Sequence, residues 1–258
     1  MQALMGRAAA RPPPVQVRSV SMLRPFVWIG RGMVDLVRCW RQDVAHASLM
    51  IVFGWVLLFL LGAHPYFLAA ALSGFLLGAP VMTTGLVELS RRAESGAATT
   101  FNDSLAPLEH NGPALVRFGA VLAAFAAAWF VVSGIFLSAV LNVPVPDFIE
   151  TFYRGFLDTA TRVQLVSYVA VGGVLALLVF VLSVVTVPAV IDLHFGAEQA
   201  MALSIETVRL NPLAMLVWGA LLVVLTAIGF GTLLFGMVVV LPLLGHATWH
   251  AYRDLVRV

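Results

Sequence analysis

The sequence predicts an all-α polytopic membrane protein with six transmembrane helices in three hairpins and amphipathic helices at the cytoplasmic interface. Hydrophobic residues make up 61% of the 258-residue chain and charged residues only 11%, with a mean hydropathy of +0.98. A soluble domain is about one quarter charged, so this composition indicates a protein whose first partner is the lipid bilayer. The formal net charge of +2 gives no reason to expect nucleic acid as a partner.

The first 23 residues are expected to form a flexible cytoplasmic tail. Residues 1–23 contain the proline run Pro12–Pro14 together with Arg7 and Arg11. They lack the apolar run of about seven or more residues that a signal peptide needs. A segment of this composition buries too little apolar surface to fold alone.

Residues 25–43 predict an amphipathic helix in the membrane interface. Apolar side chains such as Phe26 and Trp40 recur with the helical period on one side, and polar ones such as Arg31 and Asp35 share the other. Tryptophan on the apolar side with arginine on the polar side is typical of helices that lie at the lipid headgroups. An ordinary helix packed against protein is the alternative.

Four apolar stretches that end before residue 192 each have the length of one membrane span. Crossing a hydrocarbon core of about 30 Å takes about 20 helical residues. The predicted spans cover residues 47–63, 65–86, 113–141 and 163–191. Short helices outside the membrane are expected near residues 102–108, 148–156 and 197–209.

The last apolar block, Leu213–Trp249, is too long for one span. A single helix of roughly 37 residues would reach about 55 Å, nearly twice the thickness of the hydrocarbon core. Gly229 and Gly231 fall near the middle of the block, where a tight reversal between two helices needs them. The block therefore predicts a hairpin made of the fifth and sixth spans.

The arginines predict the orientation of the chain. With six spans, 13 of the 15 basic residues lie on the side of the two termini, and only Arg154 and Arg162 lie on the other. Basic residues gather on the cytoplasmic side of membrane proteins. Both termini are therefore expected in the cytoplasm.

A degenerate repeat is also expected. In each unit, an amphipathic helix precedes a span that leaves the cytoplasm and a span that returns with a proline near its inner end. The prolines are Pro80, Pro188 and Pro242, in units that cover residues 24–94, 97–194 and 196–256. The pattern predicts three hairpins around a pseudo-threefold axis, with the returning helices broken at the prolines. Chance placement of the prolines is the alternative.

The predicted spans contain no ionisable group near their centres. Ion-coupled carriers, proton pumps and voltage sensors keep such groups in the membrane interior despite the energetic cost, so these classes are disfavoured. The best local signal for a ligand is His246 with His250. Their spacing of four residues puts both imidazoles on one helix face, at a separation that suits a shared metal ion.

Aligning the three prolines brings further candidates to the same inner level. Asp192 and His246 each lie four residues after a proline, Glu88 and His250 lie eight residues after one, and His194 is close by. In a symmetric arrangement these five residues converge in a polar ring that suits a metal ion.

An alternative interpretation makes these polar residues part of the membrane interface. They then lie beside Trp249 and Tyr252 in an aromatic belt at the headgroups. The single cysteine, Cys39, excludes an intrachain disulfide and any multi-cysteine metal site. No motif for nucleophilic catalysis or for phosphate or dinucleotide binding is present, so neither enzymatic activity nor a bound cofactor is expected.

Three segments carry a resemblance to a known family. They are HPYFLAAALSGFLLGAPVMTTGLVELSRR, SVVTVPAVID and LPLLGHATWHAYRDLV. Over about residues 25–256 the chain resembles bacterial integral membrane proteins catalogued as domain of unknown function 2189. The resemblance implies a multi-pass protein of the bacterial inner (cytoplasmic) membrane and brings no biochemical role with it.

Some members of that family are labelled as cytochrome c oxidase subunits, but the residues argue against a catalytic oxidase subunit. Haem–copper chemistry needs several histidines at membrane depth. All six histidines of this chain lie at or beyond the ends of the predicted spans. An accessory role beside a respiratory complex stays open.

Three functions remain. The first is a non-enzymatic accessory, assembly or scaffold protein that acts through helix packing or through an unidentified membrane-protein partner. The second is a transporter or channel for a small molecule or lipid, with the proline-broken helices as its gate. The third is a metal- or haem-handling protein of the respiratory chain that uses His246 and His250.

Overall fold

The computed structural model describes residues 15–61, 77–141, 162–232 and 234–257, and it confirms an all-α membrane protein. The labelled helices are α1 (Arg24–Arg38), α2 (Trp40–Leu61), α4 (Thr84–Glu94), α5 (Phe101–His110), α6 (Gly112–Leu141), α9 (Arg162–Ser183), α10 (Thr186–Leu193), α11 (Ala197–Leu210), α12 (Pro212–Gly231) and α13 (Met237–Leu255). Two short strands, β1 (Gln16–Val17) and β2 (Val256–Arg257), pair antiparallel.

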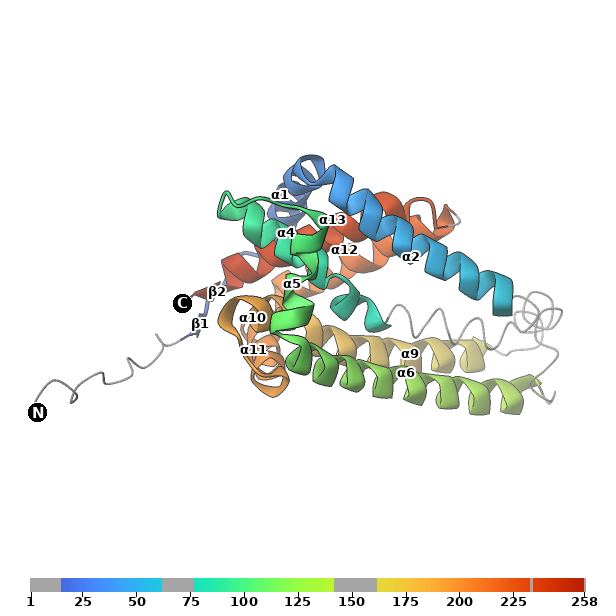
Figure 1. Cartoon of the computed structure of the whole chain (residues 1–258). Helices are drawn as coiled ribbons and strands as arrows, with labels where there is room; N and C mark the ends of the chain where they lie inside the picture. The colour runs from blue at the N-terminus through green and yellow to red at the C-terminus, as the bar shows by residue number, and fades with distance from the viewer. Residues whose placement is uncertain (1–14, 62–76, 142–161, 233, 258) are drawn as a thin grey trace, which may run out of the picture.

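The helices fall into two regions (Figure 1). We call α2, α6, α9 and α12 the apolar end, because these long helices extend to one side of the molecule. We call the rest the polar end, which comprises α1, α4, α5, α10, α11, the two strands and the second half of α13. Four helical segments of the described chain are long and apolar enough to cross a membrane. They are Trp40–Leu61, Gly112–Phe136, Val166–Leu193 and Pro212–Gly231.

These four helices correspond to the first, third, fourth and fifth predicted spans. Most of the second predicted span, residues 65–86, lies outside the described residues. The sixth predicted span forms α13, which is apolar only in its first half because His246, His250 and Arg253 follow. The count of six spans therefore stays a prediction.

The final apolar block forms two helices in contact. Helix α12 ends at Gly231 and α13 begins at Met237. Between them, Leu234 has a φ of 72°, a left-handed conformation that is uncommon for a residue with a side chain. A Cβ atom on Gly236 would lie 2.5 Å from the hydroxyl of Thr232, so glycine is required where the chain reverses.

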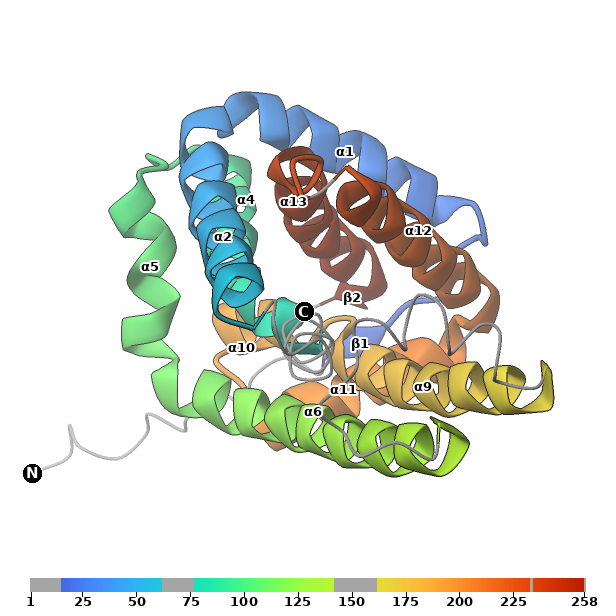
Figure 2. The same ribbon diagram turned by 90° about the vertical axis from the view of Figure 1, so that its right-hand side faces the viewer.

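Helix α1 lies against α13 over most of its length (Figure 2). The two helices approach closely at Gly32, where a Cβ atom would lie 2.9 Å from the backbone nitrogen of Ala247. Trp28 is fully buried beside this contact, and its ring meets that of Trp218 edge to face at 5.7 Å. The amphipathic α1 thus covers one side of the polar end.

The two ends of the described chain are joined, which corrects part of the tail prediction. Gln16 pairs with Arg257 and Val17 with Val256. The side chain of Asn211 accepts a hydrogen bond from the Val20 nitrogen at 2.8 Å and donates one to the Arg18 carbonyl at 2.9 Å. Residues 15–23 are therefore ordered on the protein and are not a flexible tail, because these backbone groups find partners there. Residues 1–14 lie outside the described residues.

Two of the three prolines lie near a helix break. A helical segment ends at residue 82, two residues after Pro80, and α4 starts at Thr84. Helix α9 ends at Ser183 and α10 begins three residues later, with Pro188 in its first turn. Pro188 has no N–H to donate to a carbonyl four residues earlier, which favours this interruption. At Pro242 the predicted break is wrong, because α13 continues through it.

The cytoplasmic ends predicted for the three returning spans lie together. Helices α4, α10 and α13 each contact the other two. Helices α4 and α13 approach at Gly245, where a Cβ atom would lie 2.7 Å from that of Leu86. This junction carries the candidate site residues.

Candidate functional site

His246 is the centre of the polar junction. Helix α13 runs among α1, α2 and α4, and the fully buried side chain of His246 has hydrogen-bond partners on α2 and α4. Its Nε2 lies 3.0 and 3.1 Å from the two carboxylate oxygens of Asp43 at the start of α2. Its Nδ1 lies 2.7 Å from the hydroxyl of Ser90 on α4.

The hydrogen bonds continue to α1 and back to α13. The Ser90 hydroxyl donates to Oδ2 of Asp35 at 2.7 Å, and Nε2 of His250 lies 2.8 Å from the same oxygen. The five side chains form one chain of contacts in the order Asp43, His246, Ser90, Asp35, His250. We call this set the histidine–aspartate network. It links α1, α2, α4 and α13.

Hydrogen-bond counting fixes where the protons are. Burial acts to raise the pKa of Asp35, but the hydrogen bonds from His250 and Ser90 and the nearby imidazoles outweigh it and hold that pKa below its ordinary value. An ionised Asp35 only accepts, so the single Ser90 proton goes to it. Nδ1 of His246 then lies against an oxygen whose own proton is already donated, so Nδ1 is the donor of that hydrogen bond.

Close helix approach surrounds the network with protein. A Cβ atom on Gly85 would lie 2.6 Å from Cε1 of His46, so α2 and α4 meet here only because Gly85 has no side chain. His46 lies one turn after Asp43 and its Nε2 is 2.8 Å from the hydroxyl of Ser104 on α5. Cys39, between α1 and α2, is also fully buried, and burial followed by the charge of Asp43 raises the pKa of its thiol to about 11.

The predicted metal ring is divided among separate partners. His246 and His250 face different aspartates and do not share a ligand position. Glu88 accepts hydrogen bonds from Arg91 and Arg92 of its own helix, at 2.7 and 2.8 Å. Within the described residues, no group of three or more His, Cys, Asp or Glu side chains is arranged to hold a metal ion.

The two remaining members of the predicted ring also have partners. Asp192 accepts from the hydroxyl of Tyr252 at 2.8 Å, and Nδ1 of His194 lies 3.2 Å from the side-chain nitrogen of Asn111. The helices α4, α10 and α13 converge as the repeat suggests, but opposite charges and hydrogen-bond donors intervene between the five candidate side chains.

The aromatic-belt interpretation is wrong for the C-terminal helix. Trp249 and Tyr252 are 2% and 1% exposed, so neither ring reaches a headgroup layer. The indole nitrogen of Trp249 donates to Glu94 at 2.7 Å. Burial, together with the neighbouring Asp192, raises the pKa of the Tyr252 hydroxyl, which remains a donor at neutral pH. These aromatic residues belong to the core of the polar end.

Comparison with known families decides the class of the protein. Residues 67–192, about half of the chain, match a family model described as "Predicted integral membrane protein (DUF2189)". This segment of the chain belongs to the family. No curated protein and no solved structure matches the chain.

The DUF2189 match covers only part of the network. Of the network, only Ser90 lies within the matched residues, and both aspartates and both histidines lie outside them. The family description gives no activity, and function must be argued from the geometry of this chain.

Ser90, His246 and Asp43 invite comparison with the triad of a serine hydrolase. A triad needs a hydroxyl that is open to substrate and hydrogen-bonded to a base. Ser90 is fully buried, and its proton is donated to Asp35 rather than to the imidazole. The three residues therefore do not form a prepared nucleophile in this protein.

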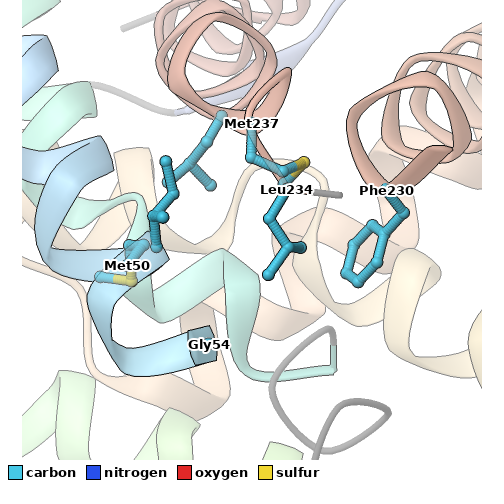
Figure 3. Close-up of a pocket in the computed structure, with 7 residues that line it drawn as sticks. Met50, Gly54, Phe230, Leu234 and Met237 are labelled. Atoms are coloured by element: carbon cyan, nitrogen blue, oxygen red, sulfur yellow. The ribbon is translucent and has the colours of Figure 1, made fainter. Parts of the chain in front are cut away.

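An apolar cavity lies away from the network, among α2, α12 and α13. Figure 3 shows Leu234 between Gly54 of α2 and Phe230 of α12, with Met237 above it and Met50 to the left. Ile51 and Leu241 complete the lining. With no charged or hydroxyl side chain in its wall, this space suits hydrocarbon and not a polar substrate.

Sequence reasoning missed Asp35, Asp43 and Ser90 as site residues. The pattern places Asp35 on the polar side of the predicted interfacial helix and Asp43 at the end of that helix, and it gives neither a partner. One signal was present, since these are the two acidic residues between Arg24 and the first apolar span. The histidine partners of Asp43 and Asp35 lie 203 and 215 residues away in the sequence, beyond the reach of local patterns.

Proposed function

We propose that this protein is a non-enzymatic accessory, assembly or scaffold protein of the bacterial inner membrane that acts by binding a membrane-protein partner. In this proposal the chain has six spans in three hairpin units and both termini in the cytoplasm. The polar end then lies at the cytoplasmic face, and the apolar end presents its helices to lipid and to the partner.

The observation that carries the proposal is that the buried ionisable groups bind one another. His246 with Asp43, His250 with Asp35 and Glu88 with two arginines are each paired within the chain. No buried side-chain nitrogen or oxygen of the described residues lacks a hydrogen-bond partner. Groups used in this way hold helices together, and a site that binds and turns over a polar substrate needs groups free to change partners.

The surfaces offered to a partner support the same proposal. In the best apolar windows of α2 and α6 only 17% of residues are buried, and in that of α12 only 22%. Large apolar side chains such as Phe59 (87% exposed), Leu216 (70%) and Val223 (70%) face outward. In a membrane, such faces contact either lipid or the helices of another protein.

Site-specific photo-crosslinking in native membranes tests this function. A photoreactive residue is placed at Phe59, Leu216, Val223 or Val166, and at the polar-end position Arg257 as a control. We expect one apolar face to give a single protein adduct of fixed size that persists when the tag and expression level are changed. Adducts with lipid alone at every apolar position, together with saturable flux of a solute in liposomes, would replace the scaffold function with transport.

The proposed orientation has its own test. A reporter that works only in the cytoplasm, fused after Val258, is expected to be active, and one that works only in the periplasm is expected to be inactive. The reason is that, with six spans, 13 of the 15 arginines share the side of the termini. A periplasmic signal would remove the six-span arrangement but would leave the crosslinking result standing.

A transporter for an apolar or lipidic molecule is the second candidate function. It is favoured by the interruption between α9 and α10 and by the break before α4, since non-helical backbone within a membrane is found where a pathway is lined. The liposome flux assay distinguishes this candidate from the first.

A further inference from the structure

Helix α1 has the opposite orientation to an amphipathic helix on a water-soluble protein, whose apolar side faces the core. Its polar side faces the protein, where the Trp28 indole nitrogen and the Arg24 guanidinium both donate to Asp254 at 2.8 and 2.6 Å. Asp35 on the same side is in the histidine–aspartate network. Arg24, Trp28 and Asp35 therefore direct their polar groups inward, to α13 and α4.

The opposite side of α1 is a stripe of exposed apolar side chains. Its members share one side at the helical period and are Met22 (52% exposed) and Leu23 (58%) just before α1, Phe26 (55%), Met33 (43%), Val34 (63%) and Val37 (71%) within it, and Trp40 (57%) at the start of α2. A stripe of this length in water would be an unusually large apolar patch for a soluble surface. We call it the α1 stripe.

The α1 stripe is continuous with the surface of a candidate span. Only Cys39 separates α1 from α2, and exposed Val44, Leu49 and Val52 continue the apolar surface onto α2. At 15 residues, α1 is too short to cross a bilayer. Figure 2 shows α1 beside α12 and α13. Because α1 leads directly into α2, the C-terminal end of the stripe lies where the apolar end begins.

Arginines line the edge of the α1 stripe. Arg24, Arg31 and Arg38 are spaced by seven residues, which places them along one side of the helix between the stripe and the buried face. Arg31 remains 47% exposed despite its contact with Asp254. Arg41 lies over the Trp40 ring at 5.4 Å and has no acidic partner among the described residues.

The exposed charge of this segment is positive. Its two acidic residues, Asp35 and Asp43, are buried and paired with histidines. An exposed apolar stripe bordered by arginines and ending in a tryptophan fits the boundary between acyl chains and phosphate groups.

We propose that α1 binds the anionic lipids of one leaflet, with the α1 stripe in the acyl region and Arg31, Arg38 and Arg41 at the lipid phosphates. The proposal rests on the membrane location of the chain and goes beyond its scaffold role. The inward side of α1 contributes Asp35 to the histidine–aspartate network. Lipid bound to the outer side therefore stabilises the packing of α1 on α13 and, with it, the network.

A depth measurement tests the location. The full chain carries a nitroxide at Val37→Cys in bilayers of phosphatidylcholine with phosphatidylglycerol; native Cys39 is buried and is left in place. We expect the label to be relaxed more by oxygen, which concentrates in the acyl region, than by a water-soluble nickel chelate. A label at Arg257→Cys, in β2 at the far side of the polar end, is the control and should show the reverse.

A lipid titration tests the charge. Phosphatidylglycerol in mixed micelles should raise the melting temperature, and Arg41→Gln should raise the half-saturating lipid concentration by about fivefold, the effect of one arginine at an anionic surface. Arg257→Gln removes the same charge from β2 and should leave that concentration unchanged. Phosphatidylcholine should not substitute.

Three results would overturn the proposal. The first is a nitroxide at Val37 that is relaxed more by the nickel chelate than by oxygen. The second is a nitroxide there that a protein partner shields from both agents. The third is an equal half-saturating lipid concentration for Arg41→Gln and the unaltered chain. A periplasmic reporter after Val258 would change which leaflet is bound and would leave the depth result unaffected, so the two proposals fail separately.

Discussion

Helices of the polar end approach so closely that glycine is required at their contacts, whereas helices of the apolar end leave most of their side chains outside. Gly32, Gly85 and Gly245 each lie where a Cβ atom would come within 3 Å of a neighbouring helix. In α2 and α6, by contrast, only 17% of the most apolar window is buried. The two regions therefore depend on different forces.

The difference shows where the fold is determined. At the polar end, buried charges are satisfied only in one arrangement of α1, α2, α4 and α13, so that arrangement is specific. At the apolar end, an exposed leucine gains little from one neighbour over another when lipid is the solvent. A substitution should therefore be costly at the polar end and mild on the outer faces of the apolar end.

The largest effect is expected from removing the central imidazole. His246→Ala leaves the buried Asp43 without its partner, which costs about 3–5 kcal/mol when a buried ion pair is broken. Chemical unfolding in detergent measures the loss. His110→Ala, at an exposed histidine on α5, is the control and should cost less than about 0.5 kcal/mol. Similar losses in the two variants would mean that the network does not hold the helices.

The same leucine-to-alanine change should separate the two regions. Leu86 is 1% exposed and packs on Gly245, so Leu86→Ala should cost about 2–5 kcal/mol through lost burial and a cavity. Leu216 on α12 is 70% exposed, and Leu216→Ala should leave the unfolding free energy nearly unchanged. A large loss at Leu216 would indicate that its face is covered by protein.

Two glycines of α1 should respond with opposite signs. Gly32→Ala brings a methyl group within 3.0 Å of backbone atoms of α13 that cannot move aside, and should cost about 1–3 kcal/mol. Gly30 has nothing within 4 Å of the same added atom. Gly30→Ala should gain up to about 1 kcal/mol from helix propensity. Melting temperatures of the pair measure this contrast, and equal signs would contradict the close contact of α1 with α13.

A smaller effect is expected from acid. Burial acts to raise the pKa of Asp254, but hydrogen bonds from Arg24 and Trp28 and the charges of two arginines hold it below its ordinary value. Because the folded-state pKa is the lower one, this carboxylate stabilises the fold above about pH 4 and loses that contribution as the pH falls further.

The melting temperature of Asp254→Asn measures that contribution. Its difference from the unaltered chain should be constant between about pH 5 and 7 and should shrink below about pH 4. A difference that stays constant down to about pH 3 would mean that Asp254 is not held ionised by its partners.

Sequence patterns were sufficient for the apolar end. Composition and the length of apolar blocks located α2, α6, α9 and α12, because lipid-facing helices are defined by their own residues. The glycines near residue 230 marked the change from α12 to α13. Of the three prolines, two accompany a break and Pro242 does not, since a helix with packed neighbours can continue through a proline.

The polar end was predictable only in part. The periodicity of residues 25–43 gave α1 and its two faces but did not show which face is buried. His246 and His250 were correctly singled out by spacing, yet their chemistry depends on Asp43 and Asp35 from other helices. These partners are brought together by close helix contacts at glycines, between segments that are far apart in the sequence. No periodic pattern in a single sequence shows which distant segments make such contacts.

A double-mutant cycle between Asp43 and His246 tests the central claim most directly. The two side chains lie 3.0 Å apart and are both buried, so Asp43→Ala and His246→Ala each leave one group unpaired. We predict that the double variant loses little more unfolding free energy than either single variant, with a coupling of about 2 kcal/mol or more. Losses that simply add would show that the two residues stabilise the protein independently and would contradict a shared network.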